Sequence, residues 1–244
     1  MHADRTSGAA VLLAIGVALG GWFVGHGFVK ARSADRFVTV KGVSEREVKA
    51  DLALWPLRLV VGDNDLSRAQ TTLARNTREV MAFLARHEID TAQADLQSIR
   101  VVDAYAQLYG GNANVPNRFI VTQTVMVRSS DPDRIFAASQ NVGDLVDAGV
   151  VLSSGEEYGP GGPTFVFTHL NDLKPAMIAE ATASAREAAE QFAQDSRSAI
   201  AGIRRANQGV FVILPRDEAP GVMEQNQLFK RVRVVSTIDY LLKD

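Results

Sequence analysis

Residues 36–63 read RFVTVKGVSEREVKADLALWPLRLVVGD and alternate in hydrophobicity in a way that is typical of two β-strands. In the first strand, Val38 and Val40 alternate with polar residues, and the polar segment Gly42–Arg46 predicts a turn. The second strand, which begins near Val48, carries apolar residues on both faces. Such a pattern predicts that this strand is buried on both sides.

Two features indicate how the second strand pairs and where it ends. Pro56 has no backbone N–H to donate to a neighbouring strand, so it predicts an edge position or a bulge at that point. The polar run Gly62–Asp65 ends the strand and offers side-chain caps for a helix that follows.

Part of this stretch resembles the opening motif of the SIMPL family, a group of bacterial envelope proteins with animal relatives named for their association with a signalling kinase. The similarity continues to about Leu242. The resemblance implies an α+β fold and a location in the cell envelope, and it brings no catalytic signature with it. The residues that carry the resemblance are Val40-Lys41-Gly42, Glu45, Val48, Ala50-Asp51 and Trp55-Pro56.

Composition restricts the classes of function. The chain has 244 residues, of which 46% are hydrophobic and 22% charged, as expected for one large globular domain or two small ones. Its formal net charge of −2 gives no basic excess for phosphate contacts, so we expect no nucleic-acid partner. The chain has no cysteine, which excludes disulfides, thiolate nucleophiles and cysteine-ligated zinc.

The segment between Arg5 and Lys30 contains 24 residues without Lys, Arg, Asp or Glu. A helix of this length spans roughly 36 Å, more than a hydrocarbon core of about 30 Å, and therefore predicts a single-pass transmembrane helix. A cleaved signal peptide with Val29-Lys30-Ala31 as its cleavage site is the alternative. Two GxxxG spacings favour helix–helix packing in lipid, although glycine is common in such segments; they are formed by Gly16, Gly20, Gly21 and Gly25.

The charges around this segment conflict with the family resemblance. Lys30, Arg32 and Arg36 follow the span and only Arg5 precedes it, which by the positive-inside rule would leave the large domain in the cytoplasm. The resemblance implies export. We expect an inner-membrane protein with its soluble domain in the periplasm, or a cleaved periplasmic form.

The remaining periodicity predicts further helices and strands. The order is β-β-α-β-β followed by α-β-β-α-β-β. It predicts an α+β fold with largely antiparallel sheets and packed helices. The shared β-β-α-β-β order suggests that the fold contains a duplicated unit. We expect an anchor and linker at 1–35 and one SIMPL-like domain at 36–244, with a subdivision near residue 130. The expected elements are helices at 64–86, 131–149 and 172–203, strands at 96–108, 118–129, 150–153, 164–168, 210–214 and 228–242, and loops at 109–117 and 215–227.

No residue pattern predicts a reaction. No GxSxG, Walker or Rossmann motif is present, and none of the four histidines (His2, His26, His87 and His169) has metal-ligand spacing. The carboxylate pairs lie in or beside expected turns, where solvent exposure is the ordinary explanation; they are Glu45/Glu47, Glu156/Glu157 and Asp217/Glu218. We expect no catalytic residue, no cofactor and no metal ligand.

Three functions follow as hypotheses. The first is a non-enzymatic, membrane-anchored envelope protein that assembles with copies of itself or with another envelope protein, as a scaffold or stress-related interaction module. Its expected contacts are the glycines of the anchor and two protruding loops that contain Tyr109 and Pro220. The second is a periplasmic binding module for a small ligand or peptide near Trp55, although a large aromatic residue there is also typical of a core. The third, an unrecognised hydrolase, lacks any constellation of polar residues.

Overall fold

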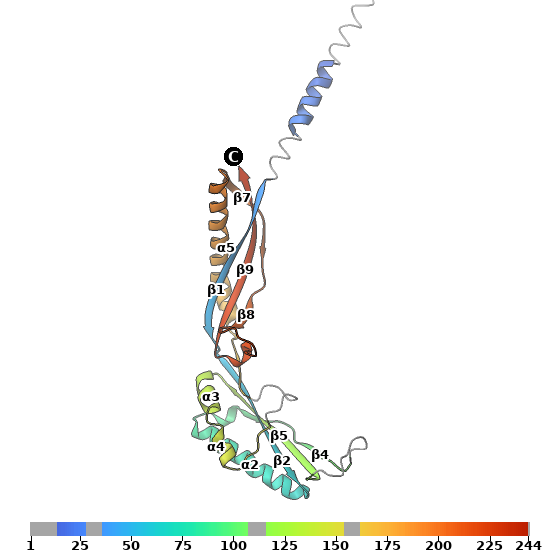
Figure 1. Ribbon diagram of the computed structural model, residues 1–244, viewed down its shortest axis with the longest axis vertical. Coiled ribbons are helices and arrows are strands. Elements are labelled where there is room, and N and C mark those ends of the chain that lie inside the picture. The colour runs from blue at the N-terminus through green and yellow to red at the C-terminus, as the bar shows by residue number, and fades with distance from the viewer. Residues whose placement is uncertain (1–13, 28–35, 107–115, 154–161, 244) are drawn as a thin grey trace, which may run out of the picture. The chain divides into compact units, whose positions relative to one another are not determined.

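The computed structural model describes residues 14–27, 36–106, 116–153 and 162–243, and it has the α+β fold with antiparallel sheets and packed helices that the sequence predicts (Figure 1). The chain forms two compact units, and it passes between them four times. Unit 1 comprises Met1–Glu45, Lys174–Val212 and Arg233–Asp244; unit 2 comprises Arg46–Leu173 and Ile213–Val232.

Unit 1 is built on a four-stranded sheet whose central strand is β9 (Phe229–Lys243). This strand lies between β1 (Phe37–Lys49) and β7 (Ala199–Gln208), and it also pairs with β8 (Val212–Pro215). The pairing of β7 with β9 is antiparallel, from Ala199 opposite Lys243 to Gln208 opposite Ser236. The strand expected at 228–242 is therefore present and lies inside a sheet.

The predicted turn at Gly42–Arg46 is wrong, because β1 continues through it and the chain turns at Ala50–Asp51. Alternate residues of β1 are buried as far as Ser44, so Gly42 and Ser44 are small members of the buried face. The Ser44 hydroxyl donates a hydrogen bond of 2.7 Å to the Glu180 carboxylate. Residues that are typical of turns serve here to admit a helix close to the strand.

That helix is α5 (Leu170–Asp195), and it approaches β1 through a stripe of small side chains. A Cβ atom added to Gly42 would lie 1.8 Å from the Ala181 carbonyl oxygen and 2.4 Å from the Ala185 nitrogen, so the two backbones are in contact. Val38, Val40, Ile238 and Tyr240 of the sheet pack with Ala185 and Ala189 in the core of this unit. The buried residues of the helix recur every four positions: Met177, Ala181, Ala185, Ala189 and Ala193.

The helix predicted to run to Ile203 ends at Asp195 instead. Arg197 adopts a positive φ of 54°, and the Ser198 N–H donates to the Ala193 carbonyl at 2.8 Å. This is a Schellman-type helix end, which usually has glycine at the position that Arg197 occupies. The residues that follow form β7, and Ala188 and Phe192 of the helix are exposed.

Unit 2 contains a five-stranded sheet in the order β3-β5-β2-β6, with β4 also paired to β5. The longest pairing joins β2 and β5 antiparallel, from Ala53 opposite Ser129 to Asp63 opposite Phe119. β4 and β5 pair antiparallel, and the strand expected at 96–108 is replaced by two shorter strands, β3 and β4. The strands are β2 (Leu52–Asp63), β3 (Ala94–Leu96), β4 (Arg100–Asp103), β5 (Phe119–Ser129) and β6 (Thr164–Val166).

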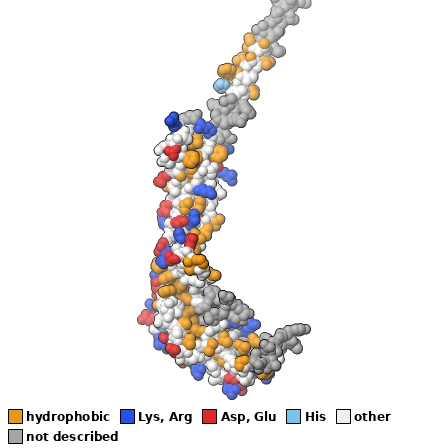
Figure 2. All heavy atoms as spheres, viewed as in Figure 1, with side chains coloured by type: hydrophobic (Ala, Val, Ile, Leu, Met, Phe, Trp, Pro, Cys, Tyr) orange, Lys and Arg blue, Asp and Glu red, His pale blue; other side chains and the backbone are white. Residues whose placement is uncertain are grey.

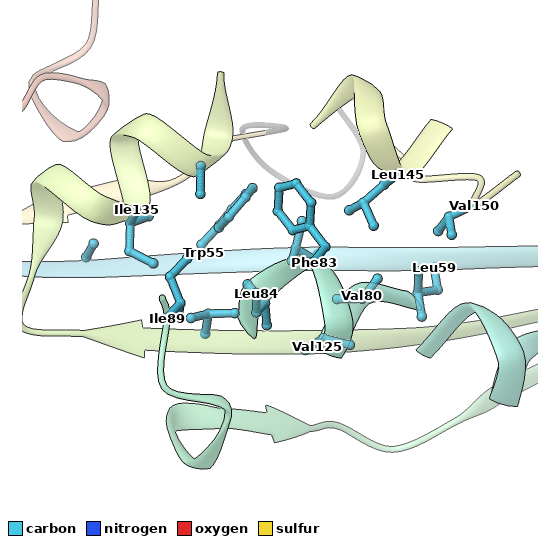
Figure 3. Packing of buried hydrophobic residues seen from close by; sticks show 14 of the residues in the cluster. Trp55, Leu59, Val80, Phe83, Leu84, Ile89, Val125, Ile135, Leu145 and Val150 are labelled. Carbon is cyan, nitrogen blue, oxygen red and sulfur yellow. The ribbon is translucent and has the colours of Figure 1, made fainter. Parts of the chain in front are cut away.

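Three helices pack on this sheet and enclose the larger core (Figure 3). Trp55 of β2 meets Phe83 of α2 edge to face, with ring centroids 6.2 Å apart. Asp65 caps α2, as predicted, and Asp131 caps α3. The helix expected at 131–149 is divided into α3 and α4. The helices are α2 (Leu66–Arg86), α3 (Pro132–Ser139) and α4 (Gly143–Asp147).

The prediction that β2 is buried on both sides is wrong. Every second residue, from Ala53 to Val61, is at most 7% exposed, and the residues between them are half-buried. Helices therefore cover one face of this strand, and its apolar side chains on the other face are only partly shielded.

Residues 14–27, in the amino-terminal segment, are helical. Within the described ranges, no helix combines the length and apolarity needed to cross a membrane.

Replacing Gly42 with Ala should destabilise the protein by about 2–3 kcal/mol, because the added methyl group meets helix backbone that cannot move aside. Urea unfolding followed by circular dichroism measures this change. Gly202→Ala, on β7, is the matched control, because a Cβ there has nothing within 4 Å and should change the free energy of unfolding by less than about 1 kcal/mol. Equal effects of the two substitutions would show that the close approach of β1 and α5 is not tight.

Candidate functional site

The most accessible part of unit 1 is the edge of its sheet. The strand order β1-β9-β7 leaves one side of β1 and one side of β7 without a partner among the strands that the structure describes. Nine of the ten residues of β7 are exposed and Ile200 is half-buried. Ile203 in this strand is 50% exposed and Val210 just beyond it is 82% exposed. This surface combines a strand border that has no partner strand among the described residues with exposed apolar side chains, which is the chemistry that another strand recognises.

The β7 edge also carries features that limit indiscriminate pairing. Its register against β9 shifts between Ile200 and Gly202 and again between Ile203 and Arg205. Arg204 and Arg205 add positive charge, and the guanidinium of Arg204 lies 4.4 Å from the centroid of the Phe37 ring. Irregular register and charged side chains are how natural edge strands resist open-ended aggregation. An edge of this kind can accept a strand of defined sequence and register.

A second candidate is a hollow of about 370 Å³ in unit 2 beside β2. Apolar side chains from β2, from α4 and from the segment after it form most of its wall; they include Trp55, Leu57, Val142, Val146 and Leu152. A cavity of this size and character can hold a small apolar molecule.

Pro56 explains why β2 is open at this hollow. The Arg58 carbonyl accepts from the Ser153 N–H at 2.9 Å, and the Val60 N–H donates to the Val151 carbonyl at 3.1 Å. Alternation along the strand turns the nitrogen of Pro56 to this same side, away from β5. The pairing with β6 ends at Leu54, so Pro56 lies in an interval that these partners do not cover. The prediction of an edge position is confirmed there.

Trp55 lines the hollow, although little of its side chain is exposed. Its side chain is 2% exposed and packs in the core against Phe83. The sequence offered a core role and a binding role for this residue. The structure shows the core role directly, and it also shows a hollow beside the ring.

Sequence reasoning missed a polar cluster around Asp51, at the turn between β1 and β2. The Asp51 carboxylate accepts hydrogen bonds from the Thr168 N–H at 3.0 Å and from the Thr168 hydroxyl at 3.1 Å, and a further hydrogen bond joins it to Nδ1 of His169. Burial acts to raise the pKa of Asp51, but the hydrogen bonds from the Thr168 backbone, from His169 and from the Thr168 hydroxyl outweigh it, so the pKa lies below its ordinary value.

This cluster holds an aspartate and a histidine together but does not form a nucleophilic triad. In a triad the hydroxyl would donate to the histidine, whereas the Thr168 hydroxyl donates to the carboxylate. The cluster ties the turn that precedes β2 to the residues that precede α5. No signal in the sequence indicates it, because its members are more than one hundred positions apart.

The structure describes only some of the other predicted contact residues. Tyr109 is outside the described residues. Pro220 is exposed in a turn, next to Gly221, which has a φ of 79°. The anchor glycines lie in the helical residues 14–27, and a Cβ added to any of them would have no neighbour within 4 Å; they are Gly16, Gly20, Gly21 and Gly25.

Three of the carboxylates singled out in the sequence have cationic partners. Glu45 pairs with Arg233 at 3.2 Å, Asp217 with Arg216 at 2.8 Å, and Glu218 with Arg231 at 3.2 Å. Glu156 and Glu157 lie outside the described residues. In the ranges that the structure covers, no three His, Asp or Glu side chains are grouped so that they could hold a metal ion.

Replacing Asp51 with Asn should lower the free energy of unfolding by about 1 kcal/mol at neutral pH, because the charged hydrogen-bond acceptor is lost. Since the pKa of Asp51 is lowered in the folded state, its contribution is present above the unfolded pKa of about 3.9 and is lost as the pH falls through the folded value. Urea unfolding at pH 7 and below pH 4 should therefore show the two proteins converging in acid. A difference that does not depend on pH would contradict this account of Asp51.

Comparison with known proteins places the chain in a family. The SIMPL family model, described as "Protein of unknown function (DUF541)", matches residues 38–232, which run from the start of β1 into β9 and cover about four-fifths of the chain. None of the curated proteins compared with the chain matches it. The chain therefore belongs to the SIMPL family (DUF541).

Proposed function

We propose that this protein is a non-enzymatic, membrane-anchored envelope protein that assembles with copies of itself and serves as a scaffold or stress-related interaction module. The observation that carries the proposal is the edge of the unit 1 sheet, where β7 is exposed along nearly its whole length. A strand with this much accessible backbone is a template for pairing with another strand.

Strand pairing between copies joins unlike edges. In the order β1-β9-β7, the open sides of β1 and β7 lie at opposite borders of one sheet. If β7 of one copy pairs with β1 of the next, every addition leaves the same two edges free at the ends of the assembly. Such a head-to-tail contact closes into a ring when its rotation allows, and otherwise continues as a filament.

The anchor in this proposal is the charge-free segment of 24 residues between Arg5 and Lys30. Large apolar side chains surround the helical part of it and are between 50% and 74% exposed; they are Ile15, Val17, Leu19, Trp22, Phe23 and Val24. So much exposed apolar surface on one helix favours lipid or a second helix over water. We place the anchor in the inner membrane and the two units in the periplasm, with cleavage to a periplasmic form as the alternative. A duplicated β-β-α-β-β origin of the fold stays a prediction.

A second candidate function is the binding of a small apolar ligand in the hollow beside Trp55. The hollow supports it, because about 370 Å³ lies within the range of small-molecule sites. The two functions use different units, so a ligand in unit 2 and an assembly edge in unit 1 are compatible.

Replacing Ile203 with Lys should weaken assembly at least tenfold, or by about 1.4 kcal/mol, because it adds a charge that a pairing strand would have to desolvate. Native mass spectrometry of protein extracted in detergent measures the stoichiometry. Ile99→Lys is the matched control, since Ile99 lies in unit 2 and is 52% exposed, compared with 50% for Ile203. The edge-pairing proposal would be contradicted if the Ile203 variant assembled as the wild type does. It would also be contradicted if the wild-type protein were monomeric at all concentrations.

Replacing the four anchor glycines with Leu tests the contribution of the membrane helix. Close packing through Gly16, Gly20, Gly21 and Gly25 would be blocked by the larger side chains, so the detergent-extracted assembly should dissociate more readily. Leu at Val17 and Val24, larger apolar residues that belong to neither GxxxG spacing, is the control. If both sets of variants keep the wild-type stoichiometry, assembly resides in the folded units alone.

A further inference from the structure

The hollow beside Trp55 lies where β2 lacks a neighbouring strand. Residues 55–58 are the part of β2 that lines it. On that side of β2 the pairing with β6 ends at Leu54, and backbone contacts resume at Arg58, whose carbonyl accepts from the Ser153 N–H. The hollow therefore coincides with the uncovered interval of β2, and the residues that line it belong to the part of the chain that the structure describes.

The apolar side chains that line the hollow range from buried to exposed. Trp55, Leu57 and Val150 are at most 3% exposed, whereas Val146 and Val151 are 60% and 61% exposed. Figure 2 shows apolar side chains at the surface of unit 2, interspersed with charged ones. A molecule in the hollow would rest on the buried side chains and cover the two exposed valines, so its binding would remove apolar surface from water.

Alternation along β2 decides which backbone groups face the uncovered interval. The Arg58 carbonyl and the Val60 N–H both point to partners on this side, away from β5, so the backbone groups of every second residue do the same. Pro56 is the member of this set that lies in the interval. It presents a carbonyl oxygen there, but its ring nitrogen carries no hydrogen. The β2 backbone therefore offers a bound molecule a hydrogen-bond acceptor and no donor.

We propose that the hollow binds a neutral small molecule with an apolar body and a hydroxyl group that donates to the Pro56 carbonyl; this inference rests on the second candidate function. Cyclic alcohols and phenols are the simplest members of this class. The volume of about 370 Å³ is near the lower end of the range of about 300–1,000 Å³ for small-molecule sites, so the occupant is small. The Ser153 hydroxyl, which also lines the hollow, can donate or accept, and it therefore suits the same class.

A peptide strand is a poorer occupant of this interval. A strand that pairs with β2 needs both a donor and an acceptor from each residue that faces it, and Pro56 supplies only the acceptor. The covered positions Leu54 and Arg58 lie directly on either side, so an added strand would make few hydrogen bonds with β2. The interval therefore favours a small molecule over strand addition.

An ionised acid is also a poorer occupant. A carboxylate brings a second acceptor to the Pro56 carbonyl, and neither group can donate to the other. Arg58 is the one charged residue that lines the hollow, and it already has an interaction partner. An acid that paired with Arg58 would have to compete with that partner, whereas a neutral hydroxyl would not.

The two tryptophans of the chain allow a local test. Full-length protein with Trp22→Phe, labelled with 5-fluorotryptophan and extracted in detergent, has a single fluorine resonance, at Trp55 in the wall of the hollow. Cyclohexanol and cyclohexanone share a ring size, but only the alcohol can donate a hydrogen bond. We expect both to shift the Trp55 resonance in titrations, with the alcohol binding at least threefold more tightly. Cyclohexanecarboxylate should bind more weakly than either.

Replacing Pro56 with Ala tests the origin of this preference. The substitution places a backbone N–H in the uncovered interval, so the variant should bind cyclohexanone at least threefold more tightly than the wild type does, and the preference for the alcohol should shrink. Pro220→Ala, in an exposed turn of the same unit, is the matched control and should keep the wild-type preference. Unfolding midpoints of both variants check that the fold is retained.

The outcomes separate this inference from the function on which it rests. If neither neutral compound shifts the Trp55 resonance, the second candidate function and this inference are both wrong. If the alcohol and the ketone bind equally well to the wild type, small-molecule binding stands and the role of the Pro56 carbonyl is wrong. That role is also contradicted if the carboxylate binds most tightly, or if Pro56→Ala keeps the wild-type preference.

Discussion

Unit 1 depends on the contact between the backbone of β1 and the backbone of α5 at Gly42. Because no side chain separates them there, the helix can lie along the strand and bury a stripe of alanines that supplies little apolar area per residue. The sheet residues provide the larger part of this core, through Val38, Val40, Ile238 and Tyr240. A helix held in this way covers one face of the sheet and leaves the borders of the sheet uncovered. The packing that stabilises the unit therefore also leaves its border strand β7 exposed.

The two units differ in the size of their cores and in the surface that they expose. Unit 2 has the larger core and long, regular pairing between β2 and β5, and its departures from regularity are local: the uncovered interval at Pro56 and the cluster at Asp51. Unit 1 has a small core and long accessible strands. Chemistry by side chains needs several polar groups held together out of water, whereas association between proteins needs accessible surface. The border of the unit 1 sheet supplies the accessible surface on which the proposed assembly relies.

Periodicity in the sequence predicted α2, β5 and β9 correctly, because each buries one face against a single neighbour and alternates accordingly. The errors have physical causes. Gly42 was interpreted as a turn residue, but its lack of a side chain serves packing. Arg197 takes the positive φ that usually indicates glycine, so nothing in the sequence marked the end of α5 or the start of β7. The cluster at Asp51 joins residues that are distant in sequence, which periodicity cannot detect. The sequence predicted both a binding site near Trp55 and a core position for its ring, and the ring is buried in the core.

The position of β9 between β1 and β7 has a consequence for biogenesis. The first strand of the sheet is synthesised long before the strand that must lie beside it, and β7 also has to wait for β9. Until that strand emerges, the β1-β9-β7 sheet cannot form. In the assembly proposed above, the two borders of the sheet therefore become available to another copy only after synthesis has reached β9.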